Sequence, residues 1–301
     1  QTYILWEIES PAYLLGFQPS QYRGFFNWTM TYRQDSTVSI PYGKLTKIKE
    51  HPQEDEQLEK LIGNFGEKNS HLARKGNSSV KVAWMVSNCL TKSNREGYVE
   101  ALKKFIDVDV FGSCYKDSKI CEKNGSDNCW NYISEHYKFY LSFENSLCND
   151  YITEKFWEPL KRNIVPIVLG KPTLMIRIQQ QVCFIEISGG ANHSAIAPYR
   201  SFIDVIGQGF SENPQLLANF LHQLDKNDSK YSSYFWWKEY YEVLNSHEDR
   251  IKGHCEVCRM LNNGFQKTSY RLDLNNYHPS NQSIVFQFSG LCNEPFMIIP
   301  S

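Results

Sequence analysis

Four charged residues follow the apolar run that begins at Phe139, in the stretch FYLSFENSLCNDYITEKFW. They are Glu144, Asp150, Glu154 and Lys155. The apolar runs on either side predict a buried strand, then a helix from about Tyr151, then a second buried strand. A lysine beside the free N–H groups of a helix that follows a parallel strand binds phosphate. We therefore interpret this stretch as an anion site, with Asn149 or Asp150 opening the helix.

A second predicted helix begins with an arginine. Ser87 ends a strand-like run, and the S-x-x-E spacing of Ser93 and Glu96 predicts a capping box. Arg95 then lies in the first turn of the helix, where its guanidinium fork suits phosphate oxygens. Arg95 and Lys155 together predict a diphosphate site. The sequence contains neither G-x-G-x-x-G nor G-x-x-x-x-G-K-[ST], so the dinucleotide fingerprint and the P-loop do not apply.

The strands and helices that position these residues alternate along the chain. The expected strands are 80–87, 106–112, 139–145, 163–170 and 201–205, and the expected helices begin near residues 93, 151 and 213. This order predicts right-handed crossovers and an α/β fold with a doubly wound parallel sheet. Ligands of such a sheet bind at the carboxyl ends of its strands.

Composition divides the chain into three parts. Residues 1–43 contain two strand-like segments, and the charged segment 44–79 resembles a solvated helix followed by a linker. The aromatic segment 231–244 predicts a helix that needs a core to bury it. The predicted parts are a first domain within 1–78, a ligand-binding domain at 79–230, and a helix with a cysteine-rich tail at 231–301 that returns to the first domain.

Charge and cysteine content limit the classes to which the protein can belong. The 301 residues carry a formal net charge of −1, which argues against a nucleic-acid binder and a membrane-surface binder. Nine cysteines and six N-x-[ST] sequons favour a secretory-pathway protein with several disulfides. The odd cysteine count implies one free thiol or a partner in a missing segment. Cys114, Cys121 and Cys129 lie in a polar segment and are expected to form disulfides, and we expect the same of Cys255-x-x-Cys258 rather than a zinc site.

Two further carboxylate motifs allow alternative interpretations. Asp107 and Asp109 match the D-x-D pattern of metal-dependent sugar-nucleotide enzymes, but their alternation with apolar residues predicts an ordinary strand. Glu9 ends the first strand and is a candidate general base. Glu7 and Glu9 point to opposite faces of a strand, so this pair does not form the two-carboxylate site of a glycosidase.

Three blocks of the sequence together resemble the α1,3-fucosyltransferases, which use GDP-fucose. FYLSFENSLCNDYITEKFWEPL resembles the donor-binding signature of that family, FNWTMTYRQDSTVSIPYG its second block, and WEIESP the segment that carries its base. The second block reads Tyr-Arg-Gln-Asp-Ser-Thr at 32–37, where the family usually has Tyr-Arg-Arg-Asp-Ser-Asp. The blocks ENSLCNDYITEKF and SNC resemble those of invertebrate members, including core α1,3-type enzymes.

The resemblance implies a GT-B fold, in which two Rossmann-like domains face each other across a cleft. It implies that Glu9 is the catalytic base and that GDP-fucose is the donor, with no essential metal or cofactor. The donor-binding residues implied by the matching motifs are Tyr42, Ser87, Arg95, Tyr140, Asn145, Tyr151, Glu154 and Lys155. Among them, Arg95 and Lys155 would hold the diphosphate, and Glu154 would contact sugar or ribose hydroxyls.

The implied reaction is inverting transfer of L-fucose to a GlcNAc hydroxyl of a glycoprotein glycan in α1,3 linkage. The family also has a longer first domain, a stem and a membrane anchor ahead of WEIESP. We therefore expect a first domain truncated at its N-terminus and a type II membrane protein of the Golgi lumen. Three acceptors stay open: the core GlcNAc of an N-glycan, a LacNAc or LacdiNAc antenna, and a protein hydroxyl. A non-catalytic protein that binds nucleotide sugar or glycan is the alternative to an enzyme.

Overall fold

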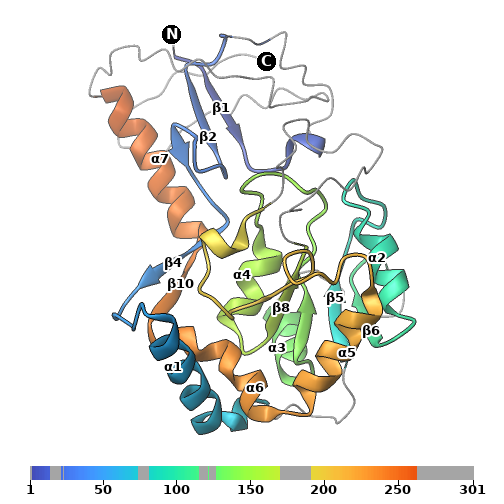
Figure 1. Ribbon diagram of the computed structural model, residues 1–301. Coiled ribbons are helices and arrows are strands. Elements are labelled where there is room, and N and C mark those ends of the chain that lie inside the picture. The colour runs from blue at the N-terminus through green and yellow to red at the C-terminus, as the bar shows by residue number, and fades with distance from the viewer. Residues whose placement is uncertain are drawn as a thin grey trace.

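The computed structural model describes residues 2–13, 22, 24–73, 81–114, 121, 127–169 and 191–262. Their strands form two parallel sheets and one antiparallel pair (Figure 1). No helix within these residues is both long and apolar enough to span a bilayer. The short 3-10 helices are Pro11–Tyr13, Ser70–Ala73, His193–Ala195 and Ser233–Glu239.

The larger sheet has five parallel strands in the order β6-β5-β7-β8-β9. Its strands are β5 (Lys81–Met85), β6 (Asp107–Phe111), β7 (Phe139–Leu141), β8 (Val165–Val168) and β9 (Ile203–Asp204). Its helices are α2 (Arg95–Leu102), α3 (Asp127–His136), α4 (Glu154–Lys161) and α5 (Pro214–Asp225). Because strand order reverses direction across β5, the doubly wound parallel sheet predicted from the alternation is confirmed.

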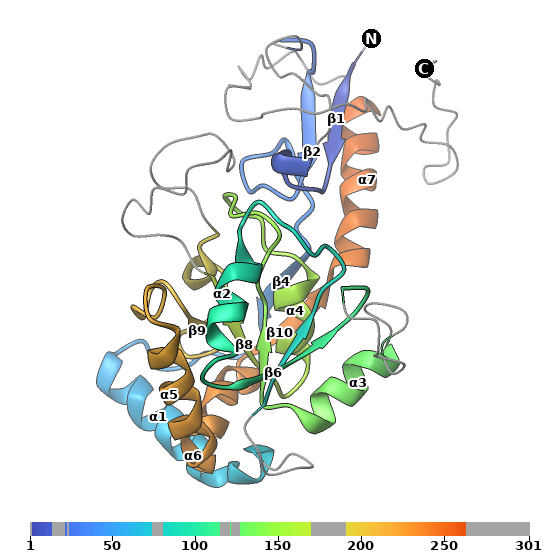
Figure 2. The same cartoon turned by 90° about the vertical axis from the view of Figure 1, so that its right-hand side faces the viewer.

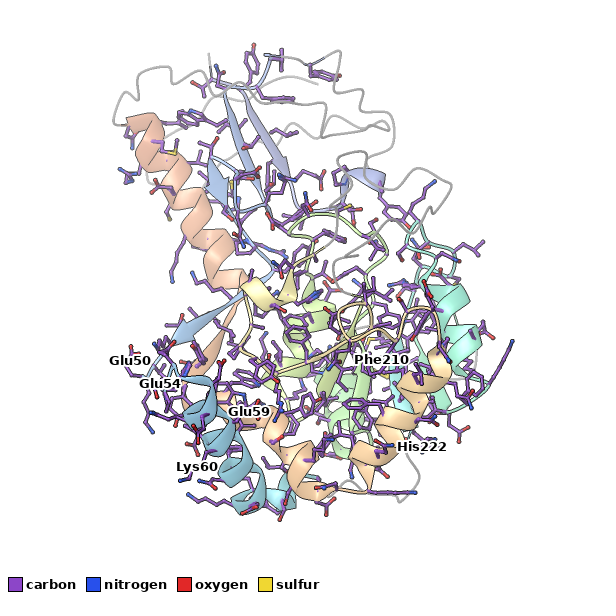
Figure 3. All side chains as sticks on the ribbon, viewed as in Figure 1. Glu50, Glu54, Glu59, Lys60, Phe210 and His222 are labelled. Carbon is purple, nitrogen blue, oxygen red and sulfur yellow. A yellow bond between two sulfur atoms is a disulfide. The ribbon has the colours of Figure 1, made fainter. Side chains whose placement is uncertain are left out.

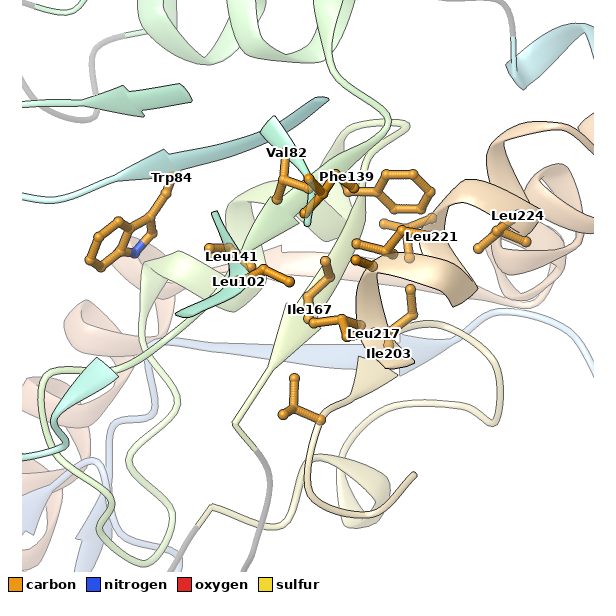
Figure 4. Packing of buried hydrophobic residues seen from close by; sticks show 14 of the residues in the cluster. Val82, Trp84, Leu102, Phe139, Leu141, Ile167, Ile203, Leu217, Leu221 and Leu224 are labelled. Carbon is orange, nitrogen blue, oxygen red and sulfur yellow. The ribbon is translucent and has the colours of Figure 1, made fainter. Parts of the chain in front are cut away.

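Side chains alternate across the strands of this sheet and build a separate core on each face. On one face Val82, Phe139 and Ile167 pack with Leu217 and Leu221 of α5, as Figure 4 shows. On the other face Ala83 and Tyr140 pack with Trp130 and Ile133 of α3, together with Phe111 and Ile164. The sheet is thus buried on both faces, which leaves its strand ends as the place for a ligand.

The smaller sheet consists of β1 (Ile4–Glu7), β2 (Trp28–Thr31) and β3 (Val38–Ser39), all parallel. The sequence analysis expected the outer two strands and missed β2. The helix α7 (Ser246–Asn262) runs beside this sheet in Figures 1 and 2, and its Val257 and Met260 share a core with Met30 and Ile40. The last helix of the described chain therefore covers the first sheet.

The aromatic segment 231–244 is not the single helix that we expected. It contains the end of α6 (Asp228–Ser232), a 3-10 helix, and most of β10 (Tyr241–Asn245). β10 pairs antiparallel with β4 (Gly43–Lys47), and it leads from the five-stranded sheet to α7. The aromatic side chains of the 3-10 helix are buried in a core, as we expected, although the segment is not one α-helix.

Helix α1 (Asp55–Lys68) is packed on one side rather than solvated all round. Its charged residues Glu59 and Lys60, labelled in Figure 3, are exposed, but Ile62 is fully buried in the core that contains Trp236 and Trp237. At Gly66 a Cβ would lie 2.2 Å from the backbone oxygen of Ser229, so the contact with α6 requires glycine. A domain boundary at residue 78 stays a prediction.

Candidate active site

The loop that leaves β7 is bonded to the start of α2. The Ser93 hydroxyl donates to the Glu144 carbonyl oxygen at 2.7 Å, and the Ser93 N–H donates to the Asn145 carbonyl oxygen at 3.1 Å. The predicted capping box is therefore wrong: the N-cap of α2 is Asn94, whose φ is 52° and whose side chain makes no capping bond. The Ser93 side chain bonds the loop after β7 instead of capping its own helix.

Arg95 is hydrogen-bonded to the same loop. The side chain is 2% exposed, and its guanidinium donates to the carbonyl oxygens of Phe143 at 2.6 Å and Asn88 at 3.1 Å. It is also paired with Glu96 at 3.3 Å and lies 5.6 Å from the centre of the Trp84 ring. In this structure Arg95 ties the ends of two neighbouring strands together, and its contact with a phosphate stays a prediction.

The helix α4 begins at Thr153, not at Asn149 or Asp150. The Thr153 hydroxyl accepts from the Lys155 N–H and is the N-cap. Asp150 has a φ of 59° and accepts a hydrogen bond from the Gln34 N–H at 3.1 Å. The sequence signal was present, because threonine is a preferred N-cap, but Asp150 offered the same chemistry three residues earlier. Asp150 instead bonds the first part of the chain.

Glu144, for which the sequence suggested no role, closes the N-terminus of α4. Its side chain is 5% exposed and accepts from the Thr153 N–H at 2.7 Å and the Thr153 hydroxyl at 2.9 Å. Its Oε2 lies 3.3 Å from Nζ of Lys155. The N–H groups of Thr153 and Lys155 are therefore bonded within the protein rather than directed at a phosphate, which corrects our expectation. A buried carboxylate occupies the anion position of this helix.

Lys155 lies between two carboxylates. Its ammonium group donates to the Thr153 hydroxyl at 2.9 Å and to Glu154 at 3.0 Å, in addition to its pair with Glu144. Burial acts to lower the pKa of Lys155, but Glu144 and Glu154 outweigh it and hold that pKa above its usual range. Burial raises the pKa of Glu144. Of the two carboxylates, Glu154 has a 55% exposed side chain and is the one that a ligand can replace.

Glu9 is brought to this loop although it belongs to the first part of the chain. Its Oε1 accepts from the hydroxyl of Tyr151 and from the Ser10 N–H, the latter at 2.8 Å. The hydroxyls of Ser10 and Ser146 are 2.7 Å apart and buried. The strand β1 ends at Glu7 and not, as we expected, at Glu9, so the candidate base lies just beyond the strand. There it meets the loop before α4, 142 residues away in sequence.

Glu7 has a different environment from Glu9. Its Oε1 accepts from the N–H groups of Ile8 at 2.9 Å and Glu9 at 2.7 Å, so its carboxylate closes its own turn. Burial raises the pKa of Glu7. The Glu7 carboxylate thus bonds its own turn, whereas the Glu9 carboxylate bonds Tyr151.

The remaining predicted donor residues are distributed around this loop. The Tyr42 hydroxyl donates to the Ile8 carbonyl oxygen at 2.7 Å. Tyr140 is 1% exposed and belongs to the core against α3, with its ring 4.9 Å from that of Trp130. The carbonyl oxygen of Ser87 accepts from the Ser113 hydroxyl at 3.3 Å. Oδ1 of Asn145 is buried and has no hydrogen-bond partner among the described residues.

Asp109 of the D-x-D motif and six of the described cysteines are bonded within the protein. Asp109 accepts from the Tyr137 hydroxyl at 2.7 Å, and the described residues include no group of three or more His, Cys, Asp or Glu placed to hold a metal ion. The disulfides are Cys89–Cys114 and Cys121–Cys129, and Cys148 and Cys258 are disulfide-bonded as well. Cys255 is free and exposed, so the expected disulfide of the C-x-x-C motif is wrong for Cys255.

The sequence matches two family models that together span most of the chain. "Fucosyltransferase, N-terminal" matches residues 1–43, and "Glycosyltransferase family 10 (fucosyltransferase) C-term" matches residues 75–189 and 179–277. The chain belongs to glycosyltransferase family 10. The family resemblance drawn from the three sequence blocks is thereby confirmed, and with the two parallel sheets it supports the predicted α/β fold of the GT-B type.

Individual members of glycosyltransferase family 10 are similar over much of the chain. It is 36% identical over 254 residues to glycoprotein 3-alpha-L-fucosyltransferase A of Drosophila melanogaster, which covers 83% of this chain and 42% of that protein. It is 31% identical over 268 residues to alpha-(1,3)-fucosyltransferase fut-6 of Caenorhabditis elegans, covering 86% and 57%. The chain spans about half the length of these relatives. A solved α1,3-fucosyltransferase with GDP matches 77% of this chain and 64% of its own at 15% identity and a TM-score of 0.46.

Proposed function

We propose that this family 10 member transfers L-fucose from GDP-fucose to a GlcNAc hydroxyl of a glycoprotein glycan, in α1,3 linkage and with inversion at C1. One observation carries the proposal: the carboxylate of Glu9 lies against the loop that also contains the start of α4 and Lys155. A candidate base and a candidate phosphate-binding cation thus occupy one site. The names of relatives, such as glycoprotein 3-alpha-L-fucosyltransferase A, support this donor sugar and linkage.

On the donor side, Lys155 stabilises the negative charge that grows on the β-phosphate as the bond to fucose breaks. In the structure its ammonium group is neutralised by Glu144 and Glu154. The diphosphate takes the position of Glu154, whose side chain is 55% exposed, while buried Glu144 remains. Glu154 is then free to contact a sugar or ribose hydroxyl. Because Lys155 supplies the compensating charge, the proposed transfer needs no metal ion.

Other side chains complete the donor site in this proposal. Arg95 keeps the strand ends in place and contributes its positive charge to the diphosphate. The Nδ2 group of Asn145 and the hydroxyl of Ser87 donate hydrogen bonds to the diphosphate. Tyr42 borders the nucleotide, and Tyr140 supports that pocket from the core.

On the acceptor side, Glu9 removes the proton from the attacking hydroxyl. Such general base catalysis contributes roughly 100- to 10,000-fold to a rate. Attack on the face of C1 opposite the diphosphate inverts the configuration, through a transition state with oxocarbenium character. In this proposal Glu9 acts on the face of the sugar that the acceptor approaches, and Lys155 stabilises the diphosphate that leaves from the other face.

The acceptor has one alternative that a relative supports. The chain is 34% identical over 171 residues, 55% of its length, to GDP-fucose protein O-fucosyltransferase 3 of Xenopus tropicalis, so a protein hydroxyl is the second candidate. The disulfides favour an oxidising compartment, and we place the protein in the secretory pathway, with the Golgi lumen as its site of action.

The proposal is tested by incubating the protein with GDP-fucose and a panel of acceptors, with and without EDTA. The panel contains N-glycans with a core GlcNAc, LacNAc and LacdiNAc antennae, and folded protein domains. We expect α1,3-fucosylated glycan in amounts that EDTA does not change. Fucose on a protein hydroxyl would favour the alternative acceptor, and GDP binding without any transfer would identify a non-catalytic binding protein.

A further inference from the structure

We propose that Tyr151 is a positioning residue for Glu9, and that its hydroxyl orients the Glu9 carboxylate for the acceptor proton. This role differs from the donor binding that the family resemblance implies for Tyr151. It rests on the proposed function of Glu9 as the base. The contact is direct, because the Tyr151 hydroxyl donates to Oε1 of Glu9.

The position of the Tyr151 ring is fixed from several sides. The residue is 2% exposed, and its ring meets those of Tyr32 at 5.1 Å and Tyr42 at 6.1 Å, both edge to face. Tyr42 is itself held by its hydrogen bond to the Ile8 carbonyl oxygen at 2.7 Å. Residues next to the base therefore enclose Tyr151, and the tyrosine hydroxyl has one defined location.

The protonation of Tyr151 suits a hydrogen-bond donor. Burial raises the pKa of its hydroxyl, and the nearby carboxylates of Glu144 and Glu9 raise it further. The phenol therefore keeps its proton at neutral pH. A buried donor facing a carboxylate forms a charge-assisted hydrogen bond, which is stronger and more directional than a neutral one.

The two hydrogen bonds on Glu9 leave one oxygen for the substrate. The Tyr151 hydroxyl and the Ser10 N–H both donate to Oε1, and Oε2 takes part in neither bond. Two donors on one oxygen restrict rotation of the carboxylate, so Oε2 has a defined direction. We assign Oε2 to the acceptor hydroxyl, because general base catalysis depends on such alignment.

The loop that contains Tyr151 also leads to the start of α4. The segment proposed to bind the donor therefore also contacts the proposed base, Glu9. Two further contacts join this loop to the first part of the chain: Ser10 with Ser146 at 2.7 Å, and the Gln34 N–H with Asp150 at 3.1 Å. The orientation of Glu9 is therefore determined by a segment that itself leads to Lys155. Loss of the Tyr151 hydroxyl affects proton transfer and leaves the phosphate site intact.

The test compares Tyr151→Phe with Tyr98→Phe. Tyr98 is the matched control, because its hydroxyl donates to the Phe210 carbonyl oxygen at 3.0 Å and has no contact with Glu9. For Tyr151→Phe we expect kcat at saturating GDP-fucose to fall about 10- to 100-fold, with the Kd for GDP unchanged. For Tyr98→Phe we expect kcat to stay at the wild-type value. Thermal unfolding of both variants shows that each is folded.

Two results would overturn this role. One is a Tyr151→Phe variant that binds GDP more weakly but keeps its kcat, since Tyr151 would then be a donor ligand. The other is a variant with unchanged kcat and Kd. Glu9→Gln separates this inference from the proposed function: if that variant still transfers fucose, the assignment of the base fails, whatever the Tyr151 result.

Discussion

The buried carboxylate of Glu144 pairs with the ammonium group of Lys155 at 3.3 Å and at the same time bonds the N-cap residue of α4. One side chain thus fixes both the helix start and the cation proposed to bind phosphate. A buried pair costs desolvation energy, and breaking it by removing one partner leaves an uncompensated charge.

We expect Glu144→Ala to lower the free energy of unfolding by about 3 to 5 kcal/mol, because Lys155 and the Thr153 N–H lose their buried partner. Urea unfolding measures the change. In a Lys155→Met background the same substitution should cost less, since the charge it leaves unpaired is absent. Equal costs in both backgrounds would contradict a coupling between Glu144 and Lys155.

Lys155→Ala should reduce turnover and GDP-fucose affinity together, each by roughly 10- to 100-fold, because a charge-assisted contact with the diphosphate is lost. Calorimetry with GDP and initial rates measure the two quantities. Lys161→Ala is the control, since Lys161 lies at the far end of α4 and pairs with Glu158 at 2.6 Å. A Lys155→Ala variant with wild-type GDP affinity would show that the diphosphate binds elsewhere.

Glu9→Gln should leave GDP binding intact and reduce transfer by about 100- to 10,000-fold, because the amide cannot accept the acceptor proton. Glu7→Gln is the matched control in the same segment, since the Glu7 carboxylate bonds only the N–H groups of its own turn in the described contacts. We expect Glu7→Gln to retain transfer. Loss of GDP binding in Glu9→Gln would sink the assignment of Glu9 as base.

The stability of the fold should decrease in mild acid because of His193. This residue is 3% exposed and packs edge to face on Phe156 of α4 at 4.8 Å, and burial lowers its pKa to about 3. The unfolded chain takes up the proton near pH 6.5, so stability present above that pH is lost as pH falls toward 3.

At pH 5 the expected loss from His193 is roughly 2 kcal/mol relative to pH 7. Thermal unfolding at the two pH values measures it. In His193→Phe, which places an aromatic ring without a titrating group beside Phe156 and Phe202, the difference in Tm between pH 7 and pH 5 should shrink. An unchanged difference would show that other groups cause the acid sensitivity.

The sequence by itself determined the α/β class, the order of the five strands along the chain, and the family. These follow from local patterns: the apolar runs and helix signals at 80–225, and a motif whose residues are contiguous from Phe139 to Trp157. The disulfides of Cys114, Cys121 and Cys129 were also expected from composition and spacing.

Only the tertiary structure decided which group each charged residue bonds. Several N-cap candidates within the stretch 149–153 had similar local chemistry, and the choice of Thr153 depends on Glu144, whose carboxylate reaches it across a loop. The burial of Ile62 against Trp236 and Trp237 of the 3-10 helix gave α1 a packed face that its charged sequence concealed.

The contact between Glu9 and Tyr151 is the clearest feature that only the tertiary structure decided. It joins residues 142 positions apart in sequence. It forms because the fold brings the segment after the strand β1 against the loop before α4. Local pattern carries no information about which of several carboxylates a distant hydroxyl will meet. Burial and the geometry of the fold select the partner, and that selection gives the three carboxylates Glu9, Glu144 and Glu154 different chemical environments.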